Sequence, residues 1–229
     1  MNLPFVLTCR PPHLVAAFDA PQTMLSWSLT RPGFQTARRV VWREVCNADL
    51  PPSLDPVAGI AALMAEAGYA DAIPLITSRD ITRHHLAQSE VETVTATCLT
   101  TCGLSNGERV GRRCTEPVPQ PGTVNVLLHV SEPLSAAAMI ETLSIVAEAR
   151  TAAILEAGVR REGVAVTGTG TDCIVVAAPE GAGGALFAGL HTAIGEAAGD
   201  AVYRAIREGV AVWQADWSAA MACRKPAAE

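Results

Sequence analysis

The sequence predicts a single α/β domain with a mixed β-sheet core and flanking helices. Short β-branched segments alternate with three longer segments of helical spacing along the 229 residues. Strands and helices interspersed in this way are typical of domains in which helices cover a sheet. The alternative architecture is a layered α/β/β/α sandwich, in which two sheets pack between helices.

Five segments have the composition and length of strands. They are residues 34–45, 73–77, 92–101, 123–130 and 173–178. The last two are apolar nearly throughout, and this pattern is typical of central strands that are buried on both faces.

Three segments are predicted helices: residues 56–68, 135–158 and 192–209. Ser135 is a good N-cap residue, and Gly68 and Gly158 are suited to helix C-termini because glycine accepts the left-handed conformation. In the third segment the apolar residues from Ile194 to Ile206 fall on one face, as in an amphipathic helix.

Composition excludes several classes of protein. The net charge of -6 and the lack of a dense Lys/Arg run argue against nucleic-acid binding, which needs a basic face. No apolar run approaches the roughly 18 residues that span a bilayer, and no secretory leader is visible. We therefore expect a cytoplasmic protein with one domain over residues 1–229, a disordered tail at 225–229, and no membrane partner. The sequence leaves open a homo-oligomer.

Seven cysteines are scattered along the chain, which favours reduced thiols over a disulfide framework. Cys98, Cys102 and Cys114 make a poor zinc pattern, because a structural site needs four ligands at tighter spacing. His84 and His85 resemble a polar pair in a helix or turn. We expect no protein-bound metal.

The most informative segment is TGTGTD, residues 167–172. Two glycines among three threonines predict a bent backbone whose N–H groups can bind an anion or a developing oxyanion. Asp172 is a candidate base, or the residue that orients a base, and Thr171 is a candidate nucleophile. A phosphate-binding loop is disfavoured because a strand follows rather than a helix. A tight turn with Asp172 as a turn residue stays open.

His191 is the second catalytic candidate. Thr192 is predicted to cap the third helix, which would place the imidazole beside the positive end of the helix dipole and keep it neutral. A neutral ring can accept a proton, so His191 is a candidate general base. The alternative is a histidine that only forms a hydrogen bond near the cap.

Two asparagines and one glutamate complete the candidates drawn from the residues themselves. Asn106 can bond an amide or serve as a turn residue, and Asn125 begins a buried strand where its amide must find partners. Glu148, deep in the longest helix, lies either in a cleft or on a solvated face.

Taken in order, several segments resemble the adenosylcobinamide amidohydrolase family. They are GLSN (103–106), PGTVN (121–125), EARTAAILEAGV (148–159), TGTGTD (167–172) and AGLHTAIGEAAGDAVYRAI (188–206), with weaker similarity in PLITSRDI (74–81). Arg150 stands where the family tends to show lysine. A guanidinium fork there would change any substrate contact.

The resemblance implies hydrolysis of adenosylcobinamide to adenosylcobyric acid and 1-amino-2-propanol, in corrinoid salvage and cobamide remodelling. It implies a corrinoid substrate and no cofactor, since the cobalt belongs to the substrate. His191 or Asp172 would activate water or Thr171, with Glu148 as a further catalytic candidate. The predicted substrate contacts are Thr169, Gly170, Asn106, Asn125, Arg109, Arg150 and Thr192. A non-catalytic corrinoid-binding protein, another amidase with a threonine nucleophile, and a metal enzyme using His84 and His85 are the competing interpretations.

Overall fold

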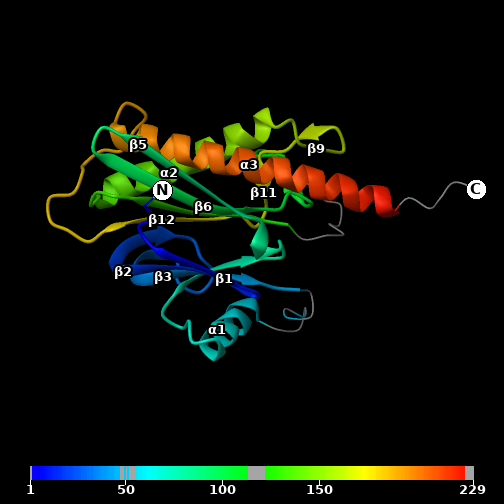
Figure 1. The fold of residues 1–229 in the computed structure, drawn as a ribbon, viewed down its shortest axis with the longest axis horizontal. Coiled ribbons are helices and arrows are strands. Elements are labelled where there is room, and N and C mark those ends of the chain that lie inside the picture. The colour runs from blue at the N-terminus through cyan, green and yellow to red at the C-terminus, as the bar shows by residue number, and fades with distance from the viewer. Residues whose placement is uncertain (1, 47–48, 50, 52–54, 113–121, 225–229) are drawn as a thin grey trace, which may run out of the picture.

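A mixed sheet of eight strands organises the chain (Figure 1). The computed structural model describes residues 2–46, 49, 51, 55–112 and 122–224. The strands are β1 (Val6–Arg10), β2 (His13–Ser26), β3 (Gly33–Glu44), β4 (Ile73–Thr77), β5 (His84–Val91), β6 (Val94–Cys102), β8 (Val124–Val130) and β12 (Cys173–Pro179). Their order is β4-β3-β2-β12-β8-β6-β5, and β1 pairs with β2. The β3–β4 and β8–β12 pairs are parallel and the others antiparallel, so the predicted mixed sheet is confirmed.

The remaining elements are three α-helices, one short 3-10 turn and two small two-stranded pairs within the described residues. The helices are α1 (Pro56–Glu66), α2 (Ala136–Glu156) and α3 (Ala193–Arg224), and η1 covers Ile81–Arg83. β7 (Gly107–Glu108) pairs with β11 (Gly168–Thr169), and β9 (Arg160–Arg161) pairs with β10 (Val164–Ala165).

The sheet folds over so that its two halves face each other. The Asn125 side chain on β8 donates a hydrogen bond to the Ile76 carbonyl on β4 at 2.7 Å. In a flat sheet four strand spacings of about 4.8 Å would separate β4 from β8, about 19 Å in all. The bend lies in the long strand β2, whose pairing with β3 shifts register between Ala17 and Gln22.

Packing therefore produces four layers from one hydrogen-bonded sheet. Between the two halves lies an apolar cluster that joins Trp42 and Leu75 of one half to Leu127 and Val175 of the other. On the outer face of the β2–β4 half, Ile60 of α1 packs against Val41. The single mixed sheet describes the hydrogen bonding, while the layered alternative describes the order of packing.

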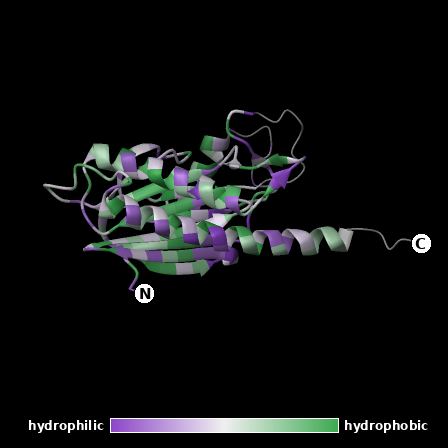
Figure 2. Cartoon of the chain, turned by 90° about the horizontal axis from the view of Figure 1, so that it is seen from above, coloured by the Kyte–Doolittle hydropathy of each residue, from purple (hydrophilic) through white to green (hydrophobic). Residues whose placement is uncertain are grey.

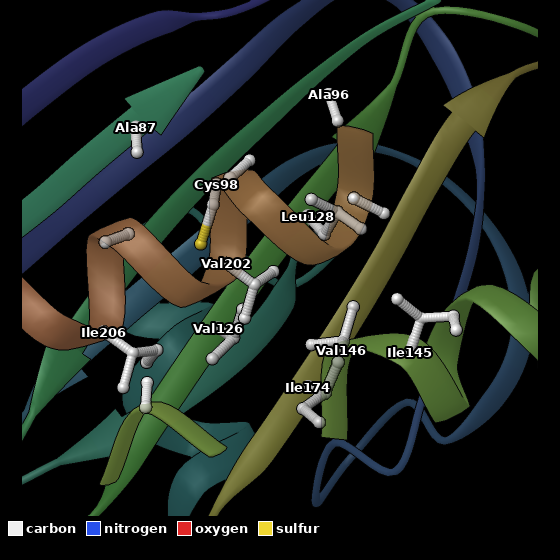
Figure 3. Close-up of a cluster of buried hydrophobic side chains, with 14 of the residues drawn as sticks. Ala87, Ala96, Cys98, Val126, Leu128, Ile145, Val146, Ile174, Val202 and Ile206 are labelled. Carbon is white, nitrogen blue, oxygen red and sulfur yellow. The ribbon is translucent and has the colours of Figure 1, made fainter. Parts of the chain in front are cut away.

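The largest core joins α2 and α3 to the outer face of β5, β6, β8 and β12 (Figure 3). Cys98, Val126 and Ile174 project from the strands towards Val146 on α2 and Val202 on α3, and all five side chains are buried. Removing such side chains from water supplies about 1.5–3 kcal/mol each, which holds both helices on this face.

The helix ends match the sequence prediction at α1 and α2. Ser135 accepts a hydrogen bond from the Ala138 N–H at 3.2 Å as the N-cap of α2. Gly68 and Gly158 follow α1 and α2 with φ of 78° and 70°, the left-handed region that glycine tolerates best.

The predicted end of α3 at Gly209 is wrong, since the helix continues to Arg224 and extends past the rest of the chain (Figure 2). Gly209 lies where α3 crosses the sheet, and a Cβ there would meet the Cys102 Sγ at 2.6 Å. The glycine thus permits a close approach between helix and strand rather than ending the helix. Further along, Asp216 bonds Arg79 at 2.5 Å and anchors the extension.

Three histidines differ in how well they were predicted. His84 and His85 begin β5 instead of forming a helix or turn, because pairing with β6 determines their backbone. His129 is a buried core residue as expected, with its Nε2 3.3 Å from the Gln22 Oε1. Burial lowers the pKa of His129 to about 4, so the ring is neutral at physiological pH.

Some strands were not predicted, and some predictions concern residues that the structure does not describe. Strands β1 and β2 were not predicted, since the DAPQ segment interrupts the apolar pattern of residues 13–26. The predicted tail at 225–229 and residue Cys114 lie outside the described residues. Over the part of the chain that is described, no helix is both long and apolar enough to cross a membrane.

The bond that closes the folded sheet can be tested with a matched pair of variants. Asn125 and Thr101 are register partners on β8 and β6, and both are fully buried. Asn125→Asp keeps the shape but replaces the donor to Ile76 with an oxygen, so the free energy of unfolding should fall by about 1–3 kcal/mol. Thr101 Oγ1 has no hydrogen-bond partner among the described residues, so Thr101→Val should be neutral or stabilising.

Urea denaturation at neutral pH measures both variants. Equal losses in the two would show that burial of polarity, rather than the Asn125–Ile76 bond, governs this region.

Candidate active site

A cavity of about 470 Å³ opens at the end of the folded sheet where its two halves meet. Its lining is drawn from five segments: residues 27–29 after β2, 45–46 after β3, 74–78 around the end of β4, 122–125 at the start of β8, and 170–173 at the start of β12. A volume of this size is within the range of small-molecule sites. The fold of the sheet therefore places the second half of the TGTGTD segment beside residues from the N-terminal third of the chain.

The TGTGTD segment forms β11 and then a turn into β12. Thr171 is exposed at the cavity, and its hydroxyl donates to the Gly122 carbonyl at 3.1 Å. The Thr123 hydroxyl in turn donates to the Thr171 carbonyl at 2.9 Å. This reciprocal pair fixes the turn against the start of β8 and presents the Thr171 side chain to the cavity.

The predicted oxyanion nest is only partly available. The Thr169 N–H donates to the Asp172 Oδ2 at 2.9 Å, and the Thr171 N–H donates to the Thr169 hydroxyl at 3.3 Å. Two N–H groups of the loop therefore already have partners inside it. A side-chain group of the cavity lining, the second N–H of the Asn125 amide, is an alternative donor to an oxyanion.

Asp172 organises the loop. Its carboxylate is only 5% exposed and accepts from the Val124 N–H at 2.8 Å and from both the N–H and the hydroxyl of Thr169. Arg150 from α2 lies 3.2 Å from the Asp172 Oδ2. The loop approaches so closely that a Cβ at Gly168 would meet this oxygen at 2.5 Å. With these acceptor positions filled, Asp172 orients the loop and does not face the substrate directly.

A line of hydroxyl groups nevertheless joins Thr171 to Asp172. The Thr169 hydroxyl is 3.4 Å from the Thr171 hydroxyl and bonds the Asp172 carboxylate. When the Thr171 hydroxyl turns from the Gly122 carbonyl to the Thr169 oxygen, its proton has a path along this line to the Asp172 carboxylate.

Thr123 and Cys173 are cavity residues that were not identified from the sequence, and Trp27 also contacts the loop. The Trp27 indole N–H donates to the Asp172 carbonyl at 2.7 Å, and Thr123 bonds the loop as described. Cys173 is buried, and burial raises the pKa of its thiol to about 12, so it is not a thiolate nucleophile at neutral pH. Thr123 stands beside Asn125 in PGTVN, so the same motif could have identified it.

The predicted convergence of His191 with the glycine-threonine loop is wrong. The loop precedes the first residue of β12, whereas His191 follows its last, and a seven-residue strand spans about 20 Å. Figure 1 shows β11 towards the right and the segment between β12 and α3 at the left. His191 is exposed and outside the cavity lining.

Thr192 caps α3 as predicted, because its hydroxyl accepts from the Gly195 N–H at 3.0 Å. Its position at that same distant end places it outside the cavity lining, so the structure gives no support for its predicted contact with the substrate.

The other predicted residues divide by their distance from the cavity. Asn125 and Gly170 line it and Thr169 lies directly behind it. Asn106 lies behind Gly122, where a Cβ would meet its Oδ1 at 2.8 Å, and that oxygen has no partner among the described residues. Arg150 contacts the loop from the α2 side rather than from the cavity.

Glu148 and Arg109 are not part of this site. Glu148 is exposed on α2, accepts from the Ser144 hydroxyl at 3.1 Å, and lies beside Leu190 and Tyr203. One face of α2 carries Arg150 and Thr151 to the loop, which turns Glu148 towards solvent. Arg109 is exposed and donates to the Ala165 carbonyl at 3.3 Å.

The described residues hold no group of three or more His, Cys, Asp or Glu side chains arranged to bind a metal ion. Burial raises the pKa of the Cys98 thiol, and it raises that of Cys102 to about 12. Both therefore stay protonated and act as small apolar side chains in the core.

Comparison with known proteins identifies a family whose model matches most of the chain. The family described as adenosylcobinamide amidohydrolase matches residues 4–217. An uncharacterized protein of Methanocaldococcus jannaschii is 37% identical over 95 residues, which cover 40% of this chain and 37% of that protein.

Two solved structures are similar to this chain at low sequence identity. The PH0078 protein from Pyrococcus horikoshii OT3 has a TM-score of 0.47 and 11% identity, covering 92% of this chain and 80% of the other. An L-aminopeptidase D-Ala-esterase/amidase from Ochrobactrum anthropi has a TM-score of 0.40 and 14% identity, covering 91% and 82%. The family match spans every segment that lines the cavity.

The contact between Asp172 and Arg150 can be measured by a double-mutant cycle. Asp172→Asn and Arg150→Gln should each lower the free energy of unfolding by about 1–3 kcal/mol, because each leaves a buried partner without its counter-charge. The double variant should lose less than the sum, with a coupling of about 1–2 kcal/mol.

The matched control is Asp200→Asn. It removes an ion pair with Arg204 that is about half exposed on both sides, and it should change stability by less than about 0.5 kcal/mol. Additive effects of the Asp172 and Arg150 changes would contradict a coupled pair.

Proposed function

The chain belongs to the adenosylcobinamide amidohydrolase family, a family of amide-hydrolysing enzymes, and on that premise we propose that it hydrolyses the aminopropanol amide of adenosylcobinamide. The products are adenosylcobyric acid and 1-amino-2-propanol. The reaction belongs to corrinoid salvage and cobamide remodelling in the cytoplasm. The cobalt enters with the substrate, so the protein itself requires no cofactor.

The observation that carries this proposal is the cavity beside Thr171. Its lining offers neutral polar groups, the hydroxyls of Thr123 and Thr171 and the amide of Asn125, among apolar walls. These groups suit a neutral amide bond and a hydroxyl-bearing arm. A corrin macrocycle is larger than 470 Å³ allows, so the arm enters the cavity and the ring remains at its mouth.

Thr171 is the group best placed to start the reaction. Its oxygen attacks the amide carbon, and its proton moves through the Thr169 hydroxyl towards Asp172. When the tetrahedral intermediate collapses, the C–N bond breaks and the amine leaves with that proton. Water then attacks the threonyl ester, releases the acid and returns a proton to Thr171.

A second route uses the same residues without a covalent step. The Thr171 hydroxyl positions a water molecule, which attacks the carbon while its proton follows the same path. Positioned proton transfer contributes about 10²–10⁴ in rate and one oxyanion donor about 10²–10³, so both contributions are needed for amide hydrolysis.

Incubation of the purified full-length chain with adenosylcobinamide tests the function. Mass spectrometry should show the corrinoid converted to adenosylcobyric acid, with 1-amino-2-propanol released in equal amount. Heat-denatured protein is the control. Corrinoid binding without release of the amine would show a non-catalytic binding protein, and cleavage only of other amides would show a different amidase.

Variants at Thr171 and His191 separate the two catalytic candidates. Thr171→Val should lower kcat by at least about 10²-fold, since it removes the attacking or water-positioning hydroxyl. Thr171→Ser keeps a hydroxyl and should retain much of the activity. His191→Ala should leave turnover near the wild-type value, because His191 lies at the far end of β12.

Thermal unfolding checks that each variant is folded. Normal turnover in Thr171→Val would remove Thr171 from the mechanism, and loss of turnover in folded His191→Ala would restore His191. An acyl adduct on Thr171, trapped at low pH, would distinguish the covalent route from direct attack by water.

A further inference from the structure

We infer that Trp27, together with Leu29, forms an apolar platform at the mouth of the cavity on which the flat face of the corrin ring rests. The inference rests on the proposed function and names the part of the protein that recognises the macrocycle rather than the scissile arm. It makes Trp27 a specificity-determining residue.

The side chains of the proposed platform are exposed at the cavity. Trp27 and Leu29 are 45% and 43% exposed, and both belong to the cavity lining. By contrast, Trp42 is fully buried and Trp213 is 8% exposed. Large apolar side chains exposed next to each other at the rim of a cavity are typical of ligand-binding sites, because covering them removes apolar surface from water.

The Trp27 side chain is held in a fixed orientation by hydrogen bonds. The Trp27 indole N–H donates to the Asp172 carbonyl at 2.7 Å, and the hydroxyl of the next residue, Ser28, donates to the Pro74 carbonyl at 2.6 Å. The polar edge of the indole is thereby satisfied by the protein, and the exposed part of the side chain is apolar ring surface. A side chain held in this way loses little conformational entropy when a ligand covers it.

The platform lies close to the proposed attacking group. Asp172, whose carbonyl holds the indole, follows Thr171 directly in the chain, and both line the same cavity. The platform is therefore linked to the group that attacks the amide. A ring that rests on Trp27 would direct its aminopropanol arm past Thr171, so binding of the macrocycle would also position the reacting carbon.

The chemistry of the ligand fits this surface. A corrin has a flat apolar ring plane and a polar rim of amides, and aromatic side chains bind such planes by offset stacking and burial of area. Other exposed apolar residues of the chain, including Phe187 at 69% exposure, lie outside the cavity lining and serve as controls.

The test separates binding of the ring from cleavage of the arm. Adenosylcobyric acid carries the macrocycle but lacks the scissile amide, so calorimetric titration of the full chain with it measures recognition of the ring alone. Trp27→Ala should raise its Kd about 10-fold or more, whereas Trp27→Phe, which keeps an aromatic face but loses the indole N–H, should stay within about 3-fold. Phe187→Ala removes an exposed aromatic outside the cavity and should leave the Kd unchanged.

Turnover of adenosylcobinamide supplies the second readout. Trp27→Ala should raise KM by a similar factor, and urea denaturation confirms that the variant is folded. If the wild-type chain binds adenosylcobyric acid and Trp27→Ala binds it equally well, the platform is wrong while the proposed function stands. If Trp27→Phe weakens binding as much as Trp27→Ala, the indole N–H bond rather than the ring face is responsible, and the platform is again wrong. If the wild-type chain neither binds nor cleaves a corrinoid, both proposals fail.

Discussion

The folding of one sheet back onto itself is the constraint on which the rest of this structure depends. A hydrogen bond from the Asn125 amide to the Ile76 carbonyl spans two strands that are four positions apart in the sheet order. The apolar cluster between the halves, with Trp42 and Leu127 among its members, supplies the driving force for this closure. The polar bond fixes where the halves meet, because a buried amide tolerates only the geometry that satisfies it. The cavity opens at that junction.

Within the junction, one carboxylate shapes the loop and one hydroxyl faces the cavity. The Asp172 carboxylate is enclosed by Val124, Thr169 and Arg150. Its contacts with them stabilise the conformation of residues 168–172. In this conformation of the loop, the Thr171 side chain is exposed. This division of roles is consistent with a preorganised site, in which groups that meet the substrate are held by others that do not. Trp27 extends the same principle to the rim, since it is fixed by the carbonyl of Asp172.

Most of the regular structure could be located from the sequence, and the errors have physical causes. The apolar runs that became β4, β8 and β12 were found because burial on both faces leaves a continuous signal. Strand β2 was missed because its bend carries Asp19, Ala20 and Pro21 through the middle of the apolar pattern. The end of α3 was misplaced because a glycine needed for contact with Cys102 resembles a glycine that ends a helix. In the site, Asn125, Thr171 and Asp172 were found from their local motifs.

What the sequence determined by itself was local: the helix caps, the buried strands, the turn chemistry of TGTGTD and the resemblance of ordered motifs to one family. These depend on residues close together in the chain, where composition and spacing carry the information. Only the tertiary structure decided which motifs meet. Strand β12 carries the chain away from the loop, so His191 is at the other end, while the folded sheet brings Trp27 and Ile76 to the loop from far earlier in the chain. Such proximity follows from strand order and from the closure of the sheet, and no local pattern of residues records either.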